Sequence, residues 1–397
     1  MKRVLGPMLF LAASAGLFGL DWGVLLNQAP KYSQDGFFYT ETVQPWASFL
    51  LREDIDLYIS GSLTLKVEPN RETDPLVPGL LIPELGRTEL TWRMTDGITL
   101  NMGRFSLAES SGLIASGLFD GVSTGIALDK MEINAGVYYS GLLYKETAEI
   151  RLSQSDIDDS KPERYFSAPR IYLNGEVLFP GILNSDHSLS LGVFAQFDTR
   201  SPRVDSQYVF LHADIAAGSD FEFGFSGVCG FIEDDWSFNG VSAAVSADFT
   251  CYLPTEIEDR LLLGFHAGSG EWNDTIKPFL PVNAASQGTI LSAKLSGTAG
   301  ARVGYTFHPV NVLSIDLSAD YLFRLDEQTY QKSDLKFNTG DSPYFLGAEF
   351  YGTLIWAPLS DLLVTAGCGA FFPQLGNAFK ADAKTLWQIS VSAVISL

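Results

Sequence analysis

A long alternation of apolar and polar residues restricts the fold of this sequence more than any other feature, and it is clearest in residues 54–67. The stretch reads DIDLYISGSLTLKV. Its odd positions carry Ile, Leu, Ile, Gly, Leu, Leu and Val, and its even positions carry Asp, Asp, Tyr, Ser, Ser, Thr and Lys. Successive side chains of a strand point to opposite faces, so this period of two predicts a β-strand with one apolar and one hydrophilic face.

The same period recurs almost to the last residue and predicts about 18 strands, with about 16 nearly as well supported. The first segment and the hairpin at 87–105 have the weakest pattern. An even number brings both chain ends to one rim of a barrel. The expected segments are 20–27, 37–51, 54–67, 87–94, 98–105, 121–129, 131–143, 168–179, 187–198, 205–216, 220–232, 238–252, 260–268, 289–308, 311–325, 343–357, 361–373 and 385–397.

The connections between these segments alternate in length. One set consists of short turns, with somewhat longer ones near 180–187 and 253–259. The other set contains most of the long loops, at 28–36, 68–86, 106–120, 144–167, 269–288, 326–342 and 374–384. Short turns on one rim and long loops on the other are typical of a transmembrane β-barrel.

Whether the apolar rows face lipid or a protein core is decided by three further features. Many segments exceed the usual strand length in soluble proteins and suit a tilted membrane strand. Aromatic residues such as Tyr39, Trp92 and Trp356 lie on the apolar parity near segment ends, where membrane–water boundaries favour them. The other parity mixes charges with Ser and Gly. Lipid offers no hydrogen-bond partners, so an antiparallel sheet in it must close. We therefore predict an all-β, antiparallel transmembrane barrel.

Composition and the N-terminus narrow the setting. The net charge of −21 argues against nucleic acid as a partner, and no apolar run is long enough for a spanning helix. Residues 1–19 have the order of an export signal: Lys2 and Arg3, an apolar run, and small residues that allow cleavage after Ala15 or Gly19. Residues 20–397 then form one barrel domain.

The last residues, LWQISVSAVISL, alternate from Trp387 to Leu397. They resemble the C-terminal strand of bacterial outer-membrane barrel proteins, although that family usually ends in Phe or Trp where this sequence has Leu397. The resemblance, which covers the whole mature chain as a pattern, implies a porin-like barrel in the bacterial outer membrane. It also implies recognition by the barrel-assembly machinery through Trp387 to Leu397 and contact with outer-membrane lipid. A homo-oligomer is compatible with the resemblance.

Charged residues on the hydrophilic parity are candidates for pore lining, because charges around an aqueous bore tune its selectivity. In many porins the third long loop folds into the lumen. Residues 106–120 occupy that position here, which would bring Arg104, Glu109 and Asp120 near a constriction; an ordinary hairpin loop is equally compatible with the sequence. The full candidate set is Asp56, Lys66, Arg93, Arg104, Glu109, Asp120, Glu132, Glu222, Asp248, Lys294, Arg302, Asp316, Asp320 and Arg324.

Catalytic chemistry has little support in the sequence. The four histidines lie in turns or on the hydrophilic parity, no common catalytic motif occurs, and we expect no enzyme, metal or cofactor. The leading hypothesis is a channel for passive diffusion of small hydrophilic solutes. Two alternatives stay open: a transporter for hydrophobic substrates similar to outer-membrane fatty-acid transporters, and a surface-exposed adhesive barrel. The first is disfavoured because the strand pattern starts almost at the predicted cleavage site.

Overall fold

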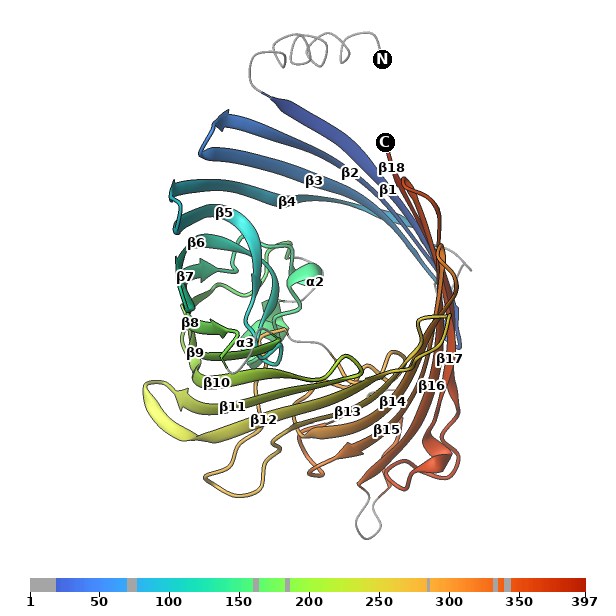
Figure 1. The fold of residues 1–397 in the computed structure, drawn as a ribbon. Coiled ribbons are helices and arrows are strands. Elements are labelled where there is room, and N and C mark those ends of the chain that lie inside the picture. The colour runs from blue at the N-terminus through green and yellow to red at the C-terminus, as the bar shows by residue number, and fades with distance from the viewer. Residues whose placement is uncertain are drawn as a thin grey trace.

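The computed structural model describes residues 19–69, 77–159, 164–182, 186–283, 286–330, 335–338 and 344–397. These residues form one 18-stranded antiparallel sheet that closes on itself, because the first strand, β1, pairs with the last, β18 (Figure 1). The predicted barrel class and the count of 18 are confirmed. The predicted export signal falls on residues outside this set, apart from Gly19, and stays a prediction.

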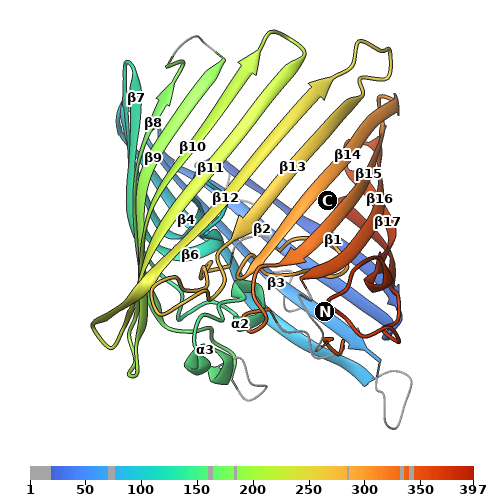
Figure 2. The same ribbon diagram turned by 90° about the horizontal axis from the view of Figure 1, so that it is seen from below.

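The strands tilt together around the barrel (Figure 2). The first nine are β1 (Leu20–Ser33), β2 (Gly36–Arg52), β3 (Ile55–Glu68), β4 (Val77–Thr95), β5 (Ile98–Ala108), β6 (Ser116–Leu128), β7 (Met131–Tyr139), β8 (Arg170–Pro180) and β9 (His187–Asp198). The second nine are β10 (Val204–Ala217), β11 (Phe221–Asp234), β12 (Ser237–Tyr252), β13 (Arg260–Gly268), β14 (Thr298–Val310), β15 (Leu313–Arg324), β16 (Phe345–Leu359), β17 (Leu362–Phe372) and β18 (Leu386–Ser396).

The helices are short pieces within the loops: α2 (Lys145–Ala148), α3 (Gln154–Asp159) and the 3-10 turn η2 (Pro373–Leu375). None of the described helices is long and apolar enough to cross a membrane. The long loops lie between β7 and β8, β13 and β14, β15 and β16, and β17 and β18, all at one rim. The short turns, the start of β1 and the end of β18 lie at the opposite rim, as the alternation of connection lengths predicts.

The two faces of the wall have the orientation that the alternation predicts. On β3 the side chains of Ile59 and Leu63 are 39% and 42% exposed on the outer surface, whereas Ser60 is 2% exposed on the inner side. On β10 the same contrast separates Val209, 54% exposed, from Tyr208, 1% exposed. Apolar rows therefore cover the outside. On the inner side, Ser60 is covered by the neighbouring strand β4, whose Arg87 carbonyl accepts its hydroxyl at 3.2 Å, whereas Tyr208 is covered by a loop inside the barrel, where its hydroxyl donates to the Leu280 carbonyl at 2.6 Å.

Three boundaries differ from the predicted ones by six residues or more. Strand β1 continues to Ser33, so the predicted loop at 28–36 shrinks to a tight turn. Strand β4 begins at Val77, inside the predicted loop 68–86, whereas β14 begins at Thr298 rather than 289. Pro83 makes the first half of β4 hard to predict from the sequence, because a proline argues against a central strand. In the structure β4 pairs with β5 only over Thr88–Thr95. Pro83 therefore pairs with β3 on one side and has no strand partner on the side of β5.

The interior holds a hydrophobic core of its own, which Figure 1 shows as folded segments gathered inside β5–β12. Buried apolar side chains from the loops, such as Ile114 and Phe279, pack on inward-facing residues of the wall. Ring contacts run from Phe119 through Tyr172 and Phe194 to Tyr208 and then to Phe279. This core was not predicted, because its wall residues lie on the parity that we expected to face water.

Candidate functional site

The loop between β5 and β6 folds into the lumen and is held by one carboxylate. Glu109, 3% exposed, accepts backbone hydrogen bonds from Ser111 at 2.6 Å, Gly112 at 3.2 Å and Ile114 at 2.8 Å. A carboxylate that accepts several N–H groups stabilises a tight loop through charge-assisted bonds. The structure thus places Glu109 inside the loop, where its carboxylate organises the backbone and is shielded from the bore.

Arg104 and Asp120, also predicted near a constriction, form an ion pair at the base of this hairpin, with the Arg104 side chain buried and that of Asp120 23% exposed. The guanidinium donates to both Asp120 oxygens at 2.9 Å. Its remaining donors reach the carbonyls of Leu85 at 2.7 Å and Leu142 at 3.0 Å. Arg104 therefore links the edge of β4 that has no strand partner to the loop between β7 and β8. Its hydrogen bond to Leu85 satisfies a carbonyl that no neighbouring strand reaches on that side.

The loop between β7 and β8 is fastened to the wall by an ionic network around Arg170. The side chains of Arg170, Asp156 and Asp198 are 0% exposed, with Arg170 Nη2 2.9 Å from Asp156 and 3.0 Å from Asp198. Arg200 contacts both aspartates from the turn after β9. Because each buried charge has an opposite partner, the cost of desolvation is offset and α3 is held in one position.

A second carboxylate holds the loop between β13 and β14. Glu349 on β16 is 0% exposed and accepts backbone hydrogen bonds from Thr289, Ile290 and Leu291 at 2.5, 3.0 and 2.9 Å. The same loop meets the β5–β6 loop, where the Val282 N–H donates to the Ile114 carbonyl at 2.7 Å. The β7–β8 loop joins them, because Asn283 Nδ2 donates to the Ala148 carbonyl at 3.1 Å. The three loops thus contact one another inside the barrel and narrow its bore.

One ion pair links this loop assembly to the wall at β3. Lys66 contacts Glu146 of α2, and this hydrogen bond lowers the pKa of the Glu146 carboxyl below its usual 4.5. Because the two residues are 80 positions apart in sequence, the pair ties a separate part of the wall to α2. Lys66 was among the predicted candidates, and its partner in the loop was not.

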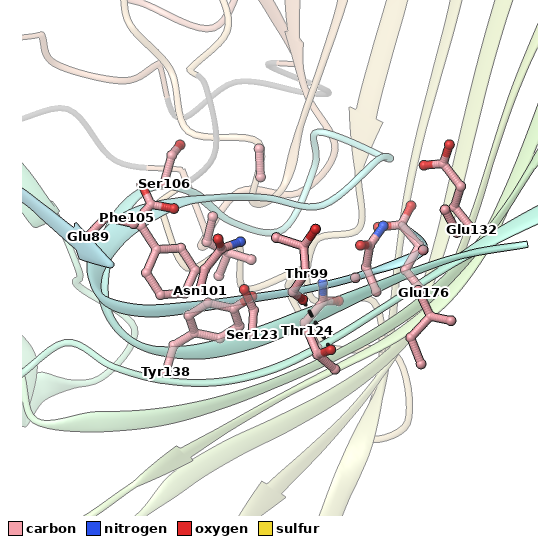
Figure 3. A pocket seen from close by; sticks show the side chains of 18 of the residues that line it. Glu89, Thr99, Asn101, Phe105, Ser106, Ser123, Thr124, Glu132, Tyr138 and Glu176 are labelled. Atoms are coloured by element: carbon pink, nitrogen blue, oxygen red, sulfur yellow. Dashed lines mark hydrogen bonds between the residues drawn. The ribbon is translucent and has the colours of Figure 1, made fainter. Parts of the chain in front are cut away.

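A hollow of about 610 Å³ lies on the inner side of β4–β8. In Figure 3 the side chains of Thr99, Asn101, Glu132 and Glu176 point into this common space from neighbouring strands. The hydroxyl of Ser110, in the β5–β6 loop, donates to Glu176. This part of the lumen is hydrophilic and acidic, and it contains the predicted candidate Glu132.

The wall from β10 to β15 carries a second group of ionisable residues. A hollow of about 310 Å³ is lined by Asp248, His266, Arg302 and Asp320 among others, and Arg302 Nε lies 2.6 Å from Asp320. A neighbouring hollow of about 200 Å³ adds Glu222. Four predicted candidates, Glu222, Asp248, Arg302 and Asp320, are therefore brought to one side of the lumen, with charges of both signs.

The other predicted candidates are spread around the interior. Asp56 pairs with Arg93 at 2.5 Å near the short-turn rim, and Asp316 accepts a hydrogen bond from Thr306 at 2.6 Å. Lys294 lies in the β13–β14 loop instead of on a strand, and desolvation there lowers the pKa of its ammonium.

Arg324, 3% exposed, stacks over Phe337 with its guanidinium carbon 4.5 Å from the ring centre. Within the described ranges, no group of three or more His, Cys, Asp or Glu side chains could hold a metal ion.

The functional residues that sequence reasoning missed are the ones that hold the loops. Glu349, Asp156 and Asp198 all have partners far away in sequence. A local signal existed only for Glu349 and Asp198, whose inward parity follows from the strand pattern. Their contacts depend on where the loops fold, which the pattern does not specify.

A closed antiparallel barrel with an apolar outside and an interior narrowed by folded loops has the architecture of an outer-membrane porin. It is similar in fold to Pseudomonas aeruginosa OprD, with a TM-score of 0.59, 11% identity and 95% of each chain covered. It is also similar to P. aeruginosa OpdK with vanillate, with a TM-score of 0.62, 12% identity and 95% and 98% covered.

The structure of P. aeruginosa OccK2 (OpdF) in complex with glucuronate gives a TM-score of 0.61 at 11% identity, covering 95% of this chain and 98% of that one. No family model matches the sequence, and no curated protein matches it. At these identities the likeness concerns the fold.

Proposed function

We propose that the protein is a channel of the bacterial outer membrane through which small hydrophilic solutes diffuse passively. The observation that carries this proposal is the lumen itself, which is lined by Ser, Thr, Asn and ionisable side chains and narrowed by loops with buried anchors. Such a bore excludes large solutes by size and tunes the passage of small ones by its charges. The fold neighbours include OprD and OccK2 (OpdF), the latter in complex with glucuronate, which supports a channel for small solutes.

The inward folding of the loops weighs against the adhesive alternative. An adhesive barrel needs long loops that extend outward to a ligand, whereas Leu143, Ala148 and Phe279 of the two longest described loops are at most 5% exposed, inside the barrel. The fatty-acid-transporter alternative requires an apolar route, and the hollows along the wall carry acids, bases and hydroxyl groups instead. Assembly through Trp387 to Leu397 and a homo-oligomeric state remain predictions.

Electrical recording in a planar lipid bilayer tests the proposal. The purified, folded protein is expected to give discrete conductance steps that rise with salt concentration, because ions cross an aqueous bore. A barrel that is folded by circular dichroism yet gives no steps would refute the channel. Binding of a surface ligand without conductance would then favour the adhesive function, and uptake of long-chain fatty acids would favour the lipid transporter.

A further inference from the structure

Six neighbouring strands form an inner wall of a different character from the rest of the lumen. Strands β16, β17, β18, β1, β2 and β3 are consecutive in the sheet. In the described part of the chain, β1, β2 and β3 contribute no buried apolar residue, and those of β16–β18, such as Leu346, Phe371 and Leu386, lie at the long-loop end of each strand. Figure 1 shows β1–β3 standing apart from the segments folded against β5–β12. Away from the long-loop ends of β16–β18, the inward side chains of the six strands therefore border the bore; we call this arc of six strands the neutral wall.

The middle of the neutral wall presents hydroxyl and amide groups without charges. The paired residues Thr42 and Thr64, with hydroxyls 3.1 Å apart, and Thr365 and Ser392 face inward and are half-buried. Gln44 is half-buried on the same face.

The charged inward residues of these strands lie toward their ends, as Lys31, Lys66, Asp21 and Asp56 do, except for Glu349, which the β13–β14 loop covers. The wall from β10 to β15 has the opposite character, since its hollows contain acids and arginines.

Two aromatic rings lie against glycines of the neutral wall. A Cβ built on Gly369 would lie 2.5 Å from Tyr351 Cδ2, and one on Gly367 would lie 3.0 Å from Tyr351 Cζ. Tyr351 thus covers two glycines of β17, and its hydroxyl lies 3.4 Å from that of Ser390. A Cβ on Gly23 would lie 3.0 Å from Trp46 Cε2 and Cζ2. A ring that rests on glycine backbone at the inner surface turns its other face toward the bore.

From this combination we infer that the bore takes neutral polyhydroxylated solutes, that is sugars or polyols, along the neutral wall. Hydroxyl and amide groups can both donate to and accept from sugar hydroxyls. The negative face of an aromatic ring attracts the polarised C–H groups on one side of a sugar ring. A charged solute would lose hydration along the middle of this wall without meeting an opposite charge; the nearby Arg87 of β4, whose guanidinium carbon lies 5.0 Å from the centre of the Tyr58 ring, is paired with Glu89. This inference rests on the proposed channel function and adds a substrate class to it.

Uptake of labelled solutes into liposomes that contain the protein tests the inference. Glucose, gluconate and glucosamine are nearly equal in size and differ in charge. Glucose is expected to enter fastest. Equal or faster entry of either charged analogue, from a preparation that shows conductance steps, would overturn the neutral wall as the route and leave the channel intact. Absence of both uptake and conductance steps would instead refute the channel.

The aromatic rings are tested by Trp46→Ala and Tyr351→Ala, with Trp236→Ala as the matched control. Trp236 is 69% exposed in the β11–β12 turn, away from the neutral wall. Each of the first two variants is expected to weaken the block of single-channel current by a neutral oligosaccharide about fivefold, as the loss of one stacking contact would do. Conductance in potassium chloride should be unchanged or slightly higher. A block as strong as in the control variant would overturn the role of the rings.

Discussion

Removing the charge of Glu349 should release the β13–β14 loop from the wall. In Glu349→Gln, an NH2 group that cannot accept a hydrogen bond replaces one carboxylate oxygen, and the remaining oxygen loses its charge. Two hydrogen bonds weaken from charge-assisted to neutral, about 1 kcal/mol each, and a third donor is left unpaired at about 1–3 kcal/mol, so the anchor loses about 3–5 kcal/mol in total. A loss at the lower end already shifts the balance between bound and released loop more than a hundredfold.

Hydrogen exchange of the amides of Thr289, Ile290 and Leu291, measured in detergent micelles, reports this loss directly. We expect their protection to fall by about two orders of magnitude, while the β-strand amides stay protected. Single-channel conductance should rise or fluctuate more, because the loop no longer narrows the bore. Asp316→Asn is the control, since Asp316 contacts Thr306 on the neighbouring strand and not the loop. Unchanged exchange and conductance in Glu349→Gln would refute the anchoring role.

Three further changes follow from the same contacts. Arg104→Met leaves Asp120, which water reaches in part, and the carbonyls of Leu85 and Leu142 without their donor, at a cost of about 1–3 kcal/mol. Limited proteolysis should then cut the β7–β8 loop sooner than in the unaltered protein. The pKa of the Glu146 carboxyl is lowered, so the ion pair between Glu146 and Lys66 is intact at and above pH 4.5 and is lost as the pH falls through the lowered pKa. The noise of the single-channel current should therefore be constant near neutral pH and increase only in acid. Glu146→Gln, which lacks the charge, should show the increased noise already at pH 7. Leu63→Arg places a charge on the lipid-facing side near the membrane centre, at a cost of about 2–4 kcal/mol. It should impair folding of the barrel in lipid, measured by heat-modifiable gel mobility. Thr64→Arg, on the inner face, should fold normally and change ion selectivity.

The strand number, the barrel class and the direction of the faces follow from the sequence, because period-two alternation records which side of each strand meets lipid. This holds well for β3, where Ile59 and Leu63 face outward and Ser60 inward. The strand prediction fails where a segment that is not a strand shows the same alternation for another reason. Residues 289–297 alternate, with Leu291 and Leu295 buried, because one side of that loop packs inside the barrel.

The positions of the candidate charges depend on contacts that no local pattern contains. Arg104, Glu109 and Asp120 were expected near a constriction, and the structure places all three within the packing of the loops. A strand pattern gives the side of the wall on which a residue lies. It does not tell whether water or another segment covers that residue, because this depends on how loops distant in sequence fold into the lumen.

The orientation of the wall is the central claim of this account, and cysteine labelling during single-channel recording tests it most directly. In a background in which Cys229, Cys251 and Cys368 are replaced by Ser, Thr42→Cys faces the lumen and Val43→Cys faces outward. A charged, membrane-impermeant thiol reagent should lower the conductance of the Thr42→Cys channel and leave that of Val43→Cys unchanged. A conductance change at Val43→Cys with none at Thr42→Cys would contradict the account.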